Sequence, residues 1–343
     1  MSFKSFAVSG IAAMIAVAWS GNPTVGVASA PSVTVFADGA AVNANSPDSI
    51  ALTDHSIWVS YTNGADSTGL SGSSTVVEYS LEGKVLRTLS IVGSVDGLKV
   101  DPQTGLVWAL QNQDGNSTLT LVDPDGGIVP GSPFQYAVTS STQGYDDVAF
   151  AGDRTFLSYT NPVNPTDATI QLLVKGSNPL RVTTILTMGA TGTNLATGQP
   201  NQPTTQNDPD SLKLTPSGDL ILTSGDDGQL IFVSHPGRNE QAVSFLTLLD
   251  PVSHVHVSGL DDAVFVTARR GVLYVAETGN NRILAIPADD LQVGSLYASV
   301  GSLHALASVS LDSGELSTVV GNLNGPHGLA FRESNDQKAD RRH

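Results

Sequence analysis

The feature that most constrains the fold of this chain is a short phrase that recurs six times between residues 48 and 331. Each copy places a polar residue ahead of a short run in which apolar residues alternate, which is the pattern of a half-buried strand. Five copies begin with aspartate and the last with histidine: Asp48–Leu52, Asp96–Val100, Asp146–Phe150, Asp210–Leu214, Asp261–Phe265 and His327–Phe331. Repetition at this period predicts a repeat architecture with one supersecondary unit per copy.

Each phrase is followed by a turn and then by a second strand. The turns are rich in Gly, Pro, Asp and Ser, as in Asp101–Gly105 and Thr215–Asp219. The second strands are expected at Ile57–Tyr61, Leu106–Leu110, Thr155–Tyr159, Leu220–Ser224 and Val272–Ala276. Trp58 and Trp108 hold matching positions in them, so both are expected to pack between units. Four strands per unit without a helical period indicate the blades of a β-propeller.

We therefore predict an all-β chain, a six-bladed β-propeller of four-stranded blades over residues 31–332, with five or seven blades as the alternatives. The ring is expected to close through its ends, with Ser32–Phe36 and Gly325–Arg332 in one blade, because closure removes exposed sheet edges. The middle strands of that sixth blade are expected at Ala305–Leu311 and Glu315–Val320. The polar stretch Met188–Pro209 is interpreted as an insertion between blades three and four.

The two ends of the chain are interpreted as lying outside the propeller. Residues 1–30 have the pattern of a signal peptide, with Lys4, an apolar run over Phe6–Ala18 and cleavage after Ala28 or Ala30. Secretion or a periplasmic location follows, and no later run is long enough to span a membrane. Residues 333–343 are charged and are expected to form a disordered tail.

Charge and composition limit the classes of partner. The formal net charge is −16, and loss of Lys4 with the signal would make it −17, which disfavours nucleic acid and anionic lipid. The chain has no cysteine, so thiol chemistry is excluded. No phosphate-binding glycine loop and no Gly-x-Ser-x-Gly motif is present, so no nucleotide or organic cofactor is indicated. We expect a monomer whose partner is a small molecule or a protein.

Equivalent residues of a closed repeat array form a ring, so the residues that begin the phrases are expected at the mouth of the central channel. They are Asp48, Asp96, Asp146, Asp210, Asp261 and His327. Carboxylates are hard oxygen ligands of the kind that Ca²⁺ or another divalent cation takes, and several of them in a narrow mouth repel one another. The alternative is that each aspartate caps its own strand by accepting hydrogen bonds from backbone N–H groups.

A second metal hypothesis concerns His254 and His256. On a strand, residues two apart point to the same side, so both imidazoles could reach one ion. With Asp210, Asp261 and His327 nearby, the set would suit Zn²⁺ or another transition ion. The alternative is that the pair is part of a solvated face.

Two segments carry a resemblance to a known family. Tyr274–Ile283 resembles the core of an NHL repeat, and Gly325–Phe331 resembles the start of one. The repeat layout is similar to the six-bladed propellers that group NHL proteins, TolB-like proteins, streptogramin lyase and the gluconolactonase family. Gluconolactonase-type enzymes hold a central divalent ion with acid and amide side chains. This chain departs from them in having Asp48 where a glutamate is expected, and Asp146 or Asp210 where an asparagine is expected.

The fold that the resemblance implies hosts binders, scaffolds and enzymes alike. The leading hypothesis is a non-catalytic exported propeller that binds a ligand or protein through its acidic channel mouth, with a structural divalent cation. The first alternative is a metal-dependent hydrolase or lyase of the lactonase type that uses Asp210, Asp261 or His327, with its catalytic residues unassigned. The second is an NHL-type protein scaffold without a metal.

Overall fold

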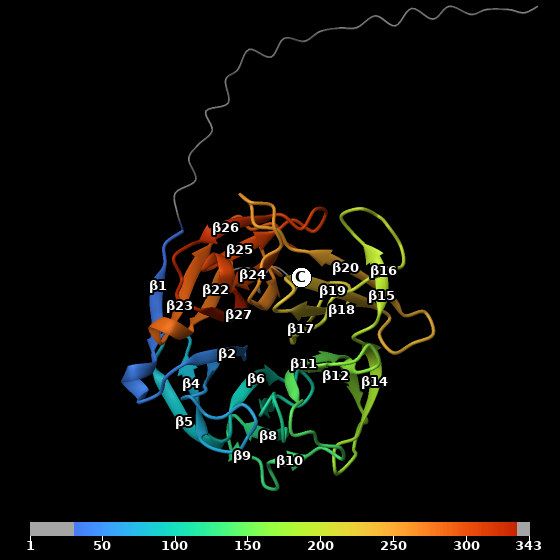
Figure 1. Cartoon of the computed structure of the whole chain (residues 1–343). Coiled ribbons are helices and arrows are strands. Elements are labelled where there is room, and N and C mark those ends of the chain that lie inside the picture. Colours follow the sequence, from blue (N-terminus) through green and yellow to red (C-terminus); the bar gives the residue numbers. More distant parts are fainter. Residues whose placement is uncertain (1–30, 335–343) are drawn as a thin grey trace, which may run out of the picture. The chain divides into compact units, whose positions relative to one another are not determined.

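The computed structural model describes residues 31–334, which form six β-sheets around a common axis (Figure 1). Each sheet has one of the six repeated phrases as its innermost strand. The chain is therefore a six-bladed β-propeller, as the repeats predict. Of the helices described in this range, none has the length and apolar character needed to span a lipid bilayer.

Blades 1 to 3 follow the chain in order, each built outward from the axis. Blade 1 consists of β2 (Pro47–Leu52), β3 (Ser56–Tyr61), β4 (Ser73–Ser80) and β5 (Val85–Val92). Blade 2 consists of β6 (Val95–Val100), β7 (Val107–Gln111) and β8 (Thr118–Asp123), with β9 (Gly127–Ile128) and β10 (Phe134–Gln135) beside β8. Blade 3 consists of β11 (Tyr145–Ala151), β12 (Arg154–Tyr159), β13 (Ala168–Leu173) and β14 (Val182–Thr187).

Blade 4 carries the inserted segment on its outer edge. Its four regular strands are β17 (Pro209–Leu214), β18 (Leu220–Ser224), β19 (Gln229–Ser234) and β20 (Ala242–Thr247). The insertion adds β15 (Thr191–Asn194), which pairs with β20 in parallel, and β16 (Gln202–Pro203). Part of the polar stretch between blades three and four is thus ordered as extra strands.

Blades 5 and 6 are interleaved along the chain. Blade 5 consists of β21 (Leu260–Phe265), β24 (Leu296–Val300), β25 (Ala305–Val309) and β26 (Leu316–Val320). Blade 6 consists of β27 (Pro326–Glu333), β22 (Gly271–Glu277), β23 (Arg282–Ala288) and β1 (Thr34–Asp38). The remaining elements are three 3₁₀ turns, η1 (Gly39–Val42), η2 (Thr278–Asn280) and η3 (Gly301–Leu303).

Three strands expected from the sequence therefore lie in a different blade from the predicted one. The strand at Val272–Ala276 was expected in blade five beside Asp261–Phe265, but β22 pairs with β27. The strands at Ala305–Leu311 and Glu315–Val320 were expected in blade six, but β25 and β26 complete the sheet of β21. The expectation assumed that consecutive strands pair, which holds for only about two thirds of them.

Specific contacts hold β22 in blade 6. The buried carboxylate of Glu277 accepts a hydrogen bond from the Asn324 backbone N–H at 2.9 Å, just ahead of β27. Thr278 Oγ1 donates to the Pro47 carbonyl oxygen at 2.5 Å, in the neighbouring blade 1. At Gly271 a Cβ atom would lie 2.3 Å from the Arg332 carbonyl oxygen, so only glycine allows this close pairing with β27. The two NHL-like segments, distant in sequence, thus form one blade.

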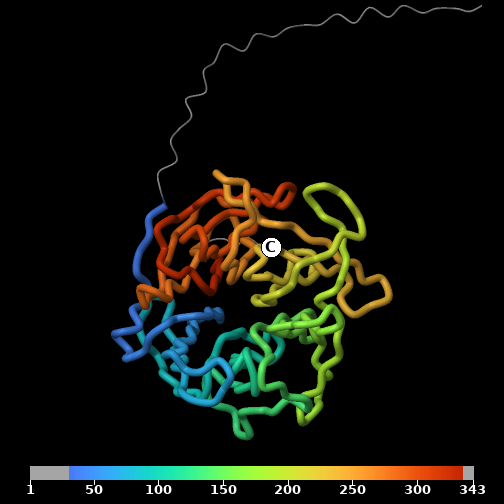
Figure 2. Tube along the Cα trace, in the orientation of Figure 1, coloured from blue at the N-terminus to red at the C-terminus, as the bar shows by residue number. Residues whose placement is uncertain are grey.

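The N-terminal strand closes the ring, as predicted from Ser32–Phe36. In Figure 2 the blue start of the described chain runs beside its orange segment, and β1 pairs with β23 from Thr34↔Ala285 to Asp38↔Arg282. The ring of Phe36 packs edge-on against Tyr79 of blade 1 and Tyr274 of blade 6, at centroid distances of 5.9 and 5.1 Å. The propeller is held together at this seam by strand pairing and by aromatic packing.

The inner strand of every blade carries a β-bulge at the same place. In blade 1 the register with β3 passes from Pro47↔Tyr61 to Ile50↔Val59, so three residues of β2 span two of its partner. The same shift occurs at the first two phrase residues in the other five blades. A bulge bends its strand and redirects side chains. The repeated phrase therefore encodes a bulged channel mouth.

The boundary of the charged tail differs slightly from the expectation. The last strand, β27, extends through Glu333, whereas the tail was expected to begin at residue 333. Residues 335–343 and the predicted signal peptide at residues 1–30 lie outside the described residues.

Candidate functional site at the channel mouth

The six residues that begin the repeated phrases hold equivalent positions in the structure. Each is the second residue of its inner strand, just ahead of or within the bulge, and each is half-buried: Asp48 in β2, Asp96 in β6, Asp146 in β11, Asp210 in β17, Asp261 in β21 and His327 in β27. We call this set the mouth ring.

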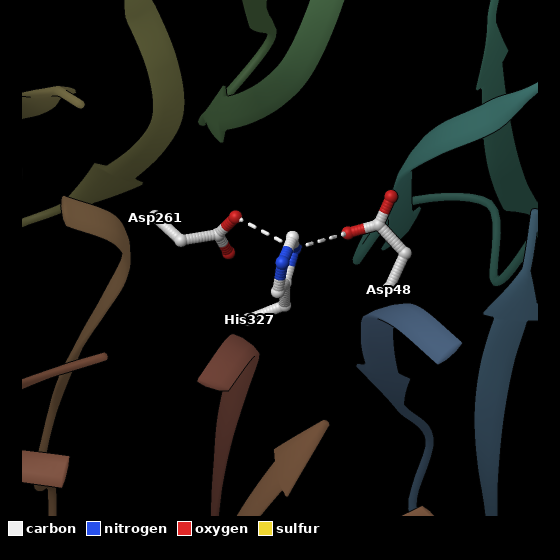
Figure 3. A group of neighbouring side chains, drawn as sticks. All are labelled: Asp48, Asp261 and His327. Atoms are coloured by element: carbon white, nitrogen blue, oxygen red, sulfur yellow. Dashed lines mark ion pairs between the residues drawn. The ribbon is translucent and has the colours of Figure 1, made fainter. Parts of the chain in front are cut away.

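Three members of the mouth ring converge on one point. The Nδ1 atom of His327 lies 3.0 Å from Oδ1 of Asp261 and 3.4 Å from Oδ1 of Asp48. Figure 3 shows the imidazole between the two carboxylates. One donor atom from each of the three side chains lies within 4.8 Å of the others, which is close enough for one metal ion to contact all three.

The two carboxylates hold a proton on the imidazole. The charge of Asp261, with a further contribution from Asp48, raises the pKa of His327 from 6.5 to about 11, although burial acts in the opposite direction. At neutral pH without a bound cation, His327 is therefore an imidazolium and supplies the positive charge between blades 5 and 1.

The other acids of the ring lack a compensating charge of this kind. Burial, followed by repulsion from neighbouring carboxylates, raises the pKa of Asp96, Asp146 and Asp210 well above the usual range. Oδ2 of Asp96 is buried and has no hydrogen-bond partner among the described residues, while Oδ1 accepts from Ser94 Oγ at 3.2 Å. These crowded acids are therefore relieved either by taking up protons or by binding a cation.

Acidic residues also surround the ring. Burial and the nearby charge of Asp226, with smaller contributions from other acids, raise the pKa of Asp208 to about 6. Asp227 accepts hydrogen bonds from the Asn207 backbone and side-chain N–H groups at 2.9 and 2.8 Å. A ligand that approaches the mouth thus meets a strongly negative surface, which favours cations.

In blades 3 and 5 the aspartate that follows the ring residue accepts hydrogen bonds from backbone N–H groups. Asp147, which follows Asp146, accepts from the backbone N–H of Val148 at 2.8 Å and from that of Leu212 in the next blade at 3.0 Å. Asp262, which follows Asp261, likewise accepts from Ala263 at 2.7 Å and Leu329 at 2.7 Å. Asp147 and Asp262 thus join adjacent blades, whereas Asp146 and Asp261 belong to the mouth ring.

Beneath the mouth ring lies a buried ion network that the sequence reading missed. Lys99 Nζ lies 2.8 Å from Asp147 Oδ2, and Lys213 Nζ lies 3.4 Å from the same oxygen and 2.6 Å from Asp262 Oδ1. Ser211 Oγ contacts both acids, at 2.9 and 2.6 Å. The pairing lowers the pKa of Asp147 and raises that of Lys213 despite burial. The network therefore ties blades 2 to 5 together around the axis.

A sequence pattern for this network was available. The phrases of blades 3 and 5 carry a second acid, and those of blades 2 and 4 carry lysine at the fourth position. The bulge brings the second and fourth positions of neighbouring blades to one layer of the channel. The complementary charges in neighbouring phrases were the observation that could have revealed it.

The structure does not bring His254 and His256 together with the other residues of the second metal hypothesis. His254 and His256 are exposed and lie in the loop between β20 and β21, not on a strand, and His254 has φ of 55°. Nδ1 of His256 lies 3.3 Å from the Val257 carbonyl oxygen. Among residues 31–334, the set of metal-ligating side chains that converge consists of Asp48, Asp261 and His327 and includes neither of them.

Comparison with known proteins gives similarity in structure only. No protein-family model matches the chain, and no curated protein is similar to it in sequence. A protein of unknown function from Bacteroides thetaiotaomicron has a TM-score of 0.52 at 11% identity, covering 85% of this chain and 64% of that one. The periplasmic gluconolactonase of Pseudomonas aeruginosa has a TM-score of 0.49 at 12% identity, covering 83% and 88%. Streptogramin B lyase has a TM-score of 0.47 at 12% identity, covering 87% and 90%.

The similarity to the Bacteroides protein agrees with the propeller fold. At 11% identity it bears on the fold and not on the activity. The function must be argued from the mouth ring itself.

Proposed function

We propose that this chain binds a divalent cation of the Ca²⁺ class at its channel mouth, and that the ion helps to hold a small-molecule or protein ligand there. The observation that carries the proposal is the convergence of Asp48, Asp261 and His327 inside a ring of buried acids that repel one another when ionised. A cation neutralises this charge more effectively than a single imidazolium does.

The donor set favours a hard ion. The mouth ring offers carboxylate oxygens from several blades and one imidazole nitrogen, and Ca²⁺ takes oxygen ligands with flexible geometry. Structural and catalytic zinc sites draw mainly on His and Cys ligands. Asp48 and Asp261 would be the principal ligands. His327 would either give up its Nδ1 proton to join them or remain beside the ion as a hydrogen-bond donor.

A second candidate function is metal-dependent hydrolysis or lyase chemistry on a cyclic ester or similar carbonyl compound. The observation that favours it is the position of His327, an ionisable group directly beside both proposed ligands. A bound cation would polarise a substrate carbonyl, and His327 could transfer a proton to or from the reacting oxygen. Binding without turnover requires only the acidic ring and remains the leading proposal.

The experiment that tests the proposal is a thermal shift of the purified full chain after treatment with EDTA. We expect millimolar Ca²⁺ to raise Tm, because a ligand that binds only the folded state stabilises it. Asp261→Asn should remove most of the shift, whereas Asp312→Asn, at an exposed position, should leave it unchanged. No Ca²⁺-dependent shift in the wild-type chain would contradict the proposal. Acid release from a lactone panel then separates the enzyme from the binder.

The predicted signal peptide leads to a further part of the proposal, export from the cytoplasm. Its support is the pattern of residues 1–30. Expression of the full chain followed by N-terminal sequencing of the exported product should show cleavage after Ala28 or Ala30. Retention of the intact N-terminus in the cytoplasm would contradict export.

A further inference from the structure

The interface between blades 2 and 3 is packed less completely than the other interfaces between blades. Among residues 31–334, its apolar cluster contains six buried residues and eight that are only partly buried. The cluster between blades 1 and 2 contains nine buried and two partly buried residues. Of the six apolar clusters among the described residues, this is the one in which partly buried side chains outnumber buried ones.

The outer strand of blade 2 explains the difference. In the other five blades the fourth strand has between five and eight residues: β1, β5, β14, β20 and β26. In blade 2 this strand is broken into β9 and β10, of two residues each, with a loop between them. The broken strand cannot cover the aromatic side chains that blades 2 and 3 direct toward each other.

A cavity of about 410 Å³ occupies the uncovered space. Apolar and aromatic side chains form most of its wall: Trp108, Leu121, Phe134, Phe150, Leu173 and Leu180. The rings of Trp108 and Phe150 meet edge-on at a centroid distance of 5.1 Å. The cavity also borders Asp101, which follows the end of β6, so it lies at the other end of the inner strands from the mouth ring. Its volume is in the range of small-molecule sites.

The two matching tryptophans provide an internal comparison. Trp58 in blade 1 is fully buried, and its Nε1 donates to Ser56 Oγ at 3.1 Å. Two residues before Trp108 the chain has Leu106 in place of a serine, and the Trp108 Nε1 atom is buried without a partner among the described residues. The hydroxyl of Tyr136, a buried member of the same cluster, is also unpaired. Unpaired buried donors are rare because each costs about 1–3 kcal/mol.

We propose that the cavity between blades 2 and 3 binds an uncharged, ring-containing small molecule. The aromatic and aliphatic side chains of the wall fit such a ring, and Trp108 is one of them. This site is separate from the channel mouth and does not rest on the function proposed there.

The charges at the rim favour a neutral occupant. Asp101, Asp153 and Lys175 border the opening, and together they leave a net negative charge that disfavours anions. A cation would have to lose its hydration shell against an apolar wall that has no carboxylate in its interior, which is costly. The site thus differs from the mouth ring in the class of ligand that it selects.

The test uses the indole N–H resonances of the ¹⁵N-labelled full chain, which has three tryptophans. Trp108→Phe identifies the Trp108 resonance, and Trp58 serves as the internal control because its N–H is already paired. The probes are 1-acetylnaphthalene and 1-ethylnaphthalene, two uncharged compounds that share a ring system. We expect both to cause saturable changes at Trp108, which lines the cavity, and not at Trp58.

Neighbouring leucines on β13 give matched variants. Leu173 lines the cavity, whereas Leu172 belongs to the cluster between blades 3 and 4. Leu173→Phe should fill the cavity and weaken probe binding about tenfold or more, equivalent to about 1.4 kcal/mol, and Leu172→Phe should bind like the wild type. Leu180→Phe is the second cavity-filling variant, and an unchanged Trp58 resonance reports that each variant folds. The proposal is overturned if neither probe perturbs Trp108 at saturation, or if the Leu172 and Leu173 variants bind equally.

Discussion

The Nδ1 atom of His327, in blade 6, lies 3.0 Å from a carboxylate oxygen of Asp261, in blade 5. The same atom lies 3.4 Å from Asp48, in the blade on the other side. One imidazole therefore links three adjacent blades at the channel mouth. It is also the only member of the mouth ring that can neutralise its neighbours.

The stability that His327 contributes should depend on pH. Its pKa is raised from 6.5 to about 11, so its contribution is fully present below 6.5 and is lost as pH rises through about 11. We expect the difference in unfolding free energy between the wild type and His327→Asn to shrink steadily over this window. Urea unfolding in EDTA at several pH values measures it. A difference that stays constant with pH would show that the imidazolium does not stabilise the fold.

Lys213 should be essential to the buried ion network. Its Nζ atom contacts Asp147 and Asp262, and both carboxylates are almost fully buried. Lys213→Met should lower the free energy of unfolding by about 3–5 kcal/mol, because removal of one partner leaves buried charge uncompensated. Lys175→Met, at an exposed position, is the control and should have little effect. Equal unfolding midpoints for the two variants in urea would refute a structural role for the network.

Gly328 should not tolerate a side chain. A Cβ atom there would lie 2.3 Å from the Asp48 carbonyl oxygen and 3.0 Å from the Ser49 Cα atom, both backbone atoms of blade 1. Gly328→Ala should therefore destabilise the fold by about 1–3 kcal/mol through the clash. At Gly321 the nearest atom to a Cβ is Thr318 Cγ2 at 3.6 Å, so Gly321→Ala is the matched control. Thermal unfolding in which both variants match the wild type would contradict the close approach of blades 6 and 1.

The interleaving of blades 5 and 6 can be tested by cross-linking, because the chain contains no cysteine of its own. Val264 and Tyr297 are register partners of β21 and β24. We expect the double variant Val264→Cys/Tyr297→Cys to form a disulfide on mild oxidation, as the Cα atoms of paired strands lie close enough. Val264→Cys/Val272→Cys should not, since β22 belongs to blade 6. Mass spectrometry of the oxidised proteins detects the disulfide in each variant. A disulfide in Val264→Cys/Val272→Cys and none in Val264→Cys/Tyr297→Cys would contradict the interleaving and support pairing of consecutive strands.

The repeats made the general architecture predictable. The phrases that begin with Asp48, Asp96, Asp146 and Asp210 each mark one inner strand, and equal spacing within the phrase placed their acids in one ring. The closing strand near Phe36 followed from the same argument, because a propeller with an incomplete last blade would expose two sheet edges.

The strand order of blades 5 and 6, the buried ion network and the cavity depend on long-range pairing that local sequence patterns do not encode. The strand at Val272–Ala276 was expected beside Asp261–Phe265, but close packing of Gly271 against β27 places it in the next blade. The contact of Lys213 with Asp147 and Asp262 required knowledge of the bulge, which changes the direction of alternate side chains. The cavity beside Trp108 arises because the outer strand of blade 2 is broken into β9 and β10. No sequence pattern around Trp108 indicates that break.

Equilibrium dialysis against radioactive Ca²⁺ measures whether the channel mouth binds a cation. After removal of metals with EDTA, the full chain should retain one ion at saturation, with Asp48 and Asp261 as its principal ligands. The double variant Asp48→Asn/Asp261→Asn should retain none, and Asp312→Asn should bind like the wild type. A wild-type chain that binds no ion, or a double variant that still binds one with unchanged affinity, would contradict the account.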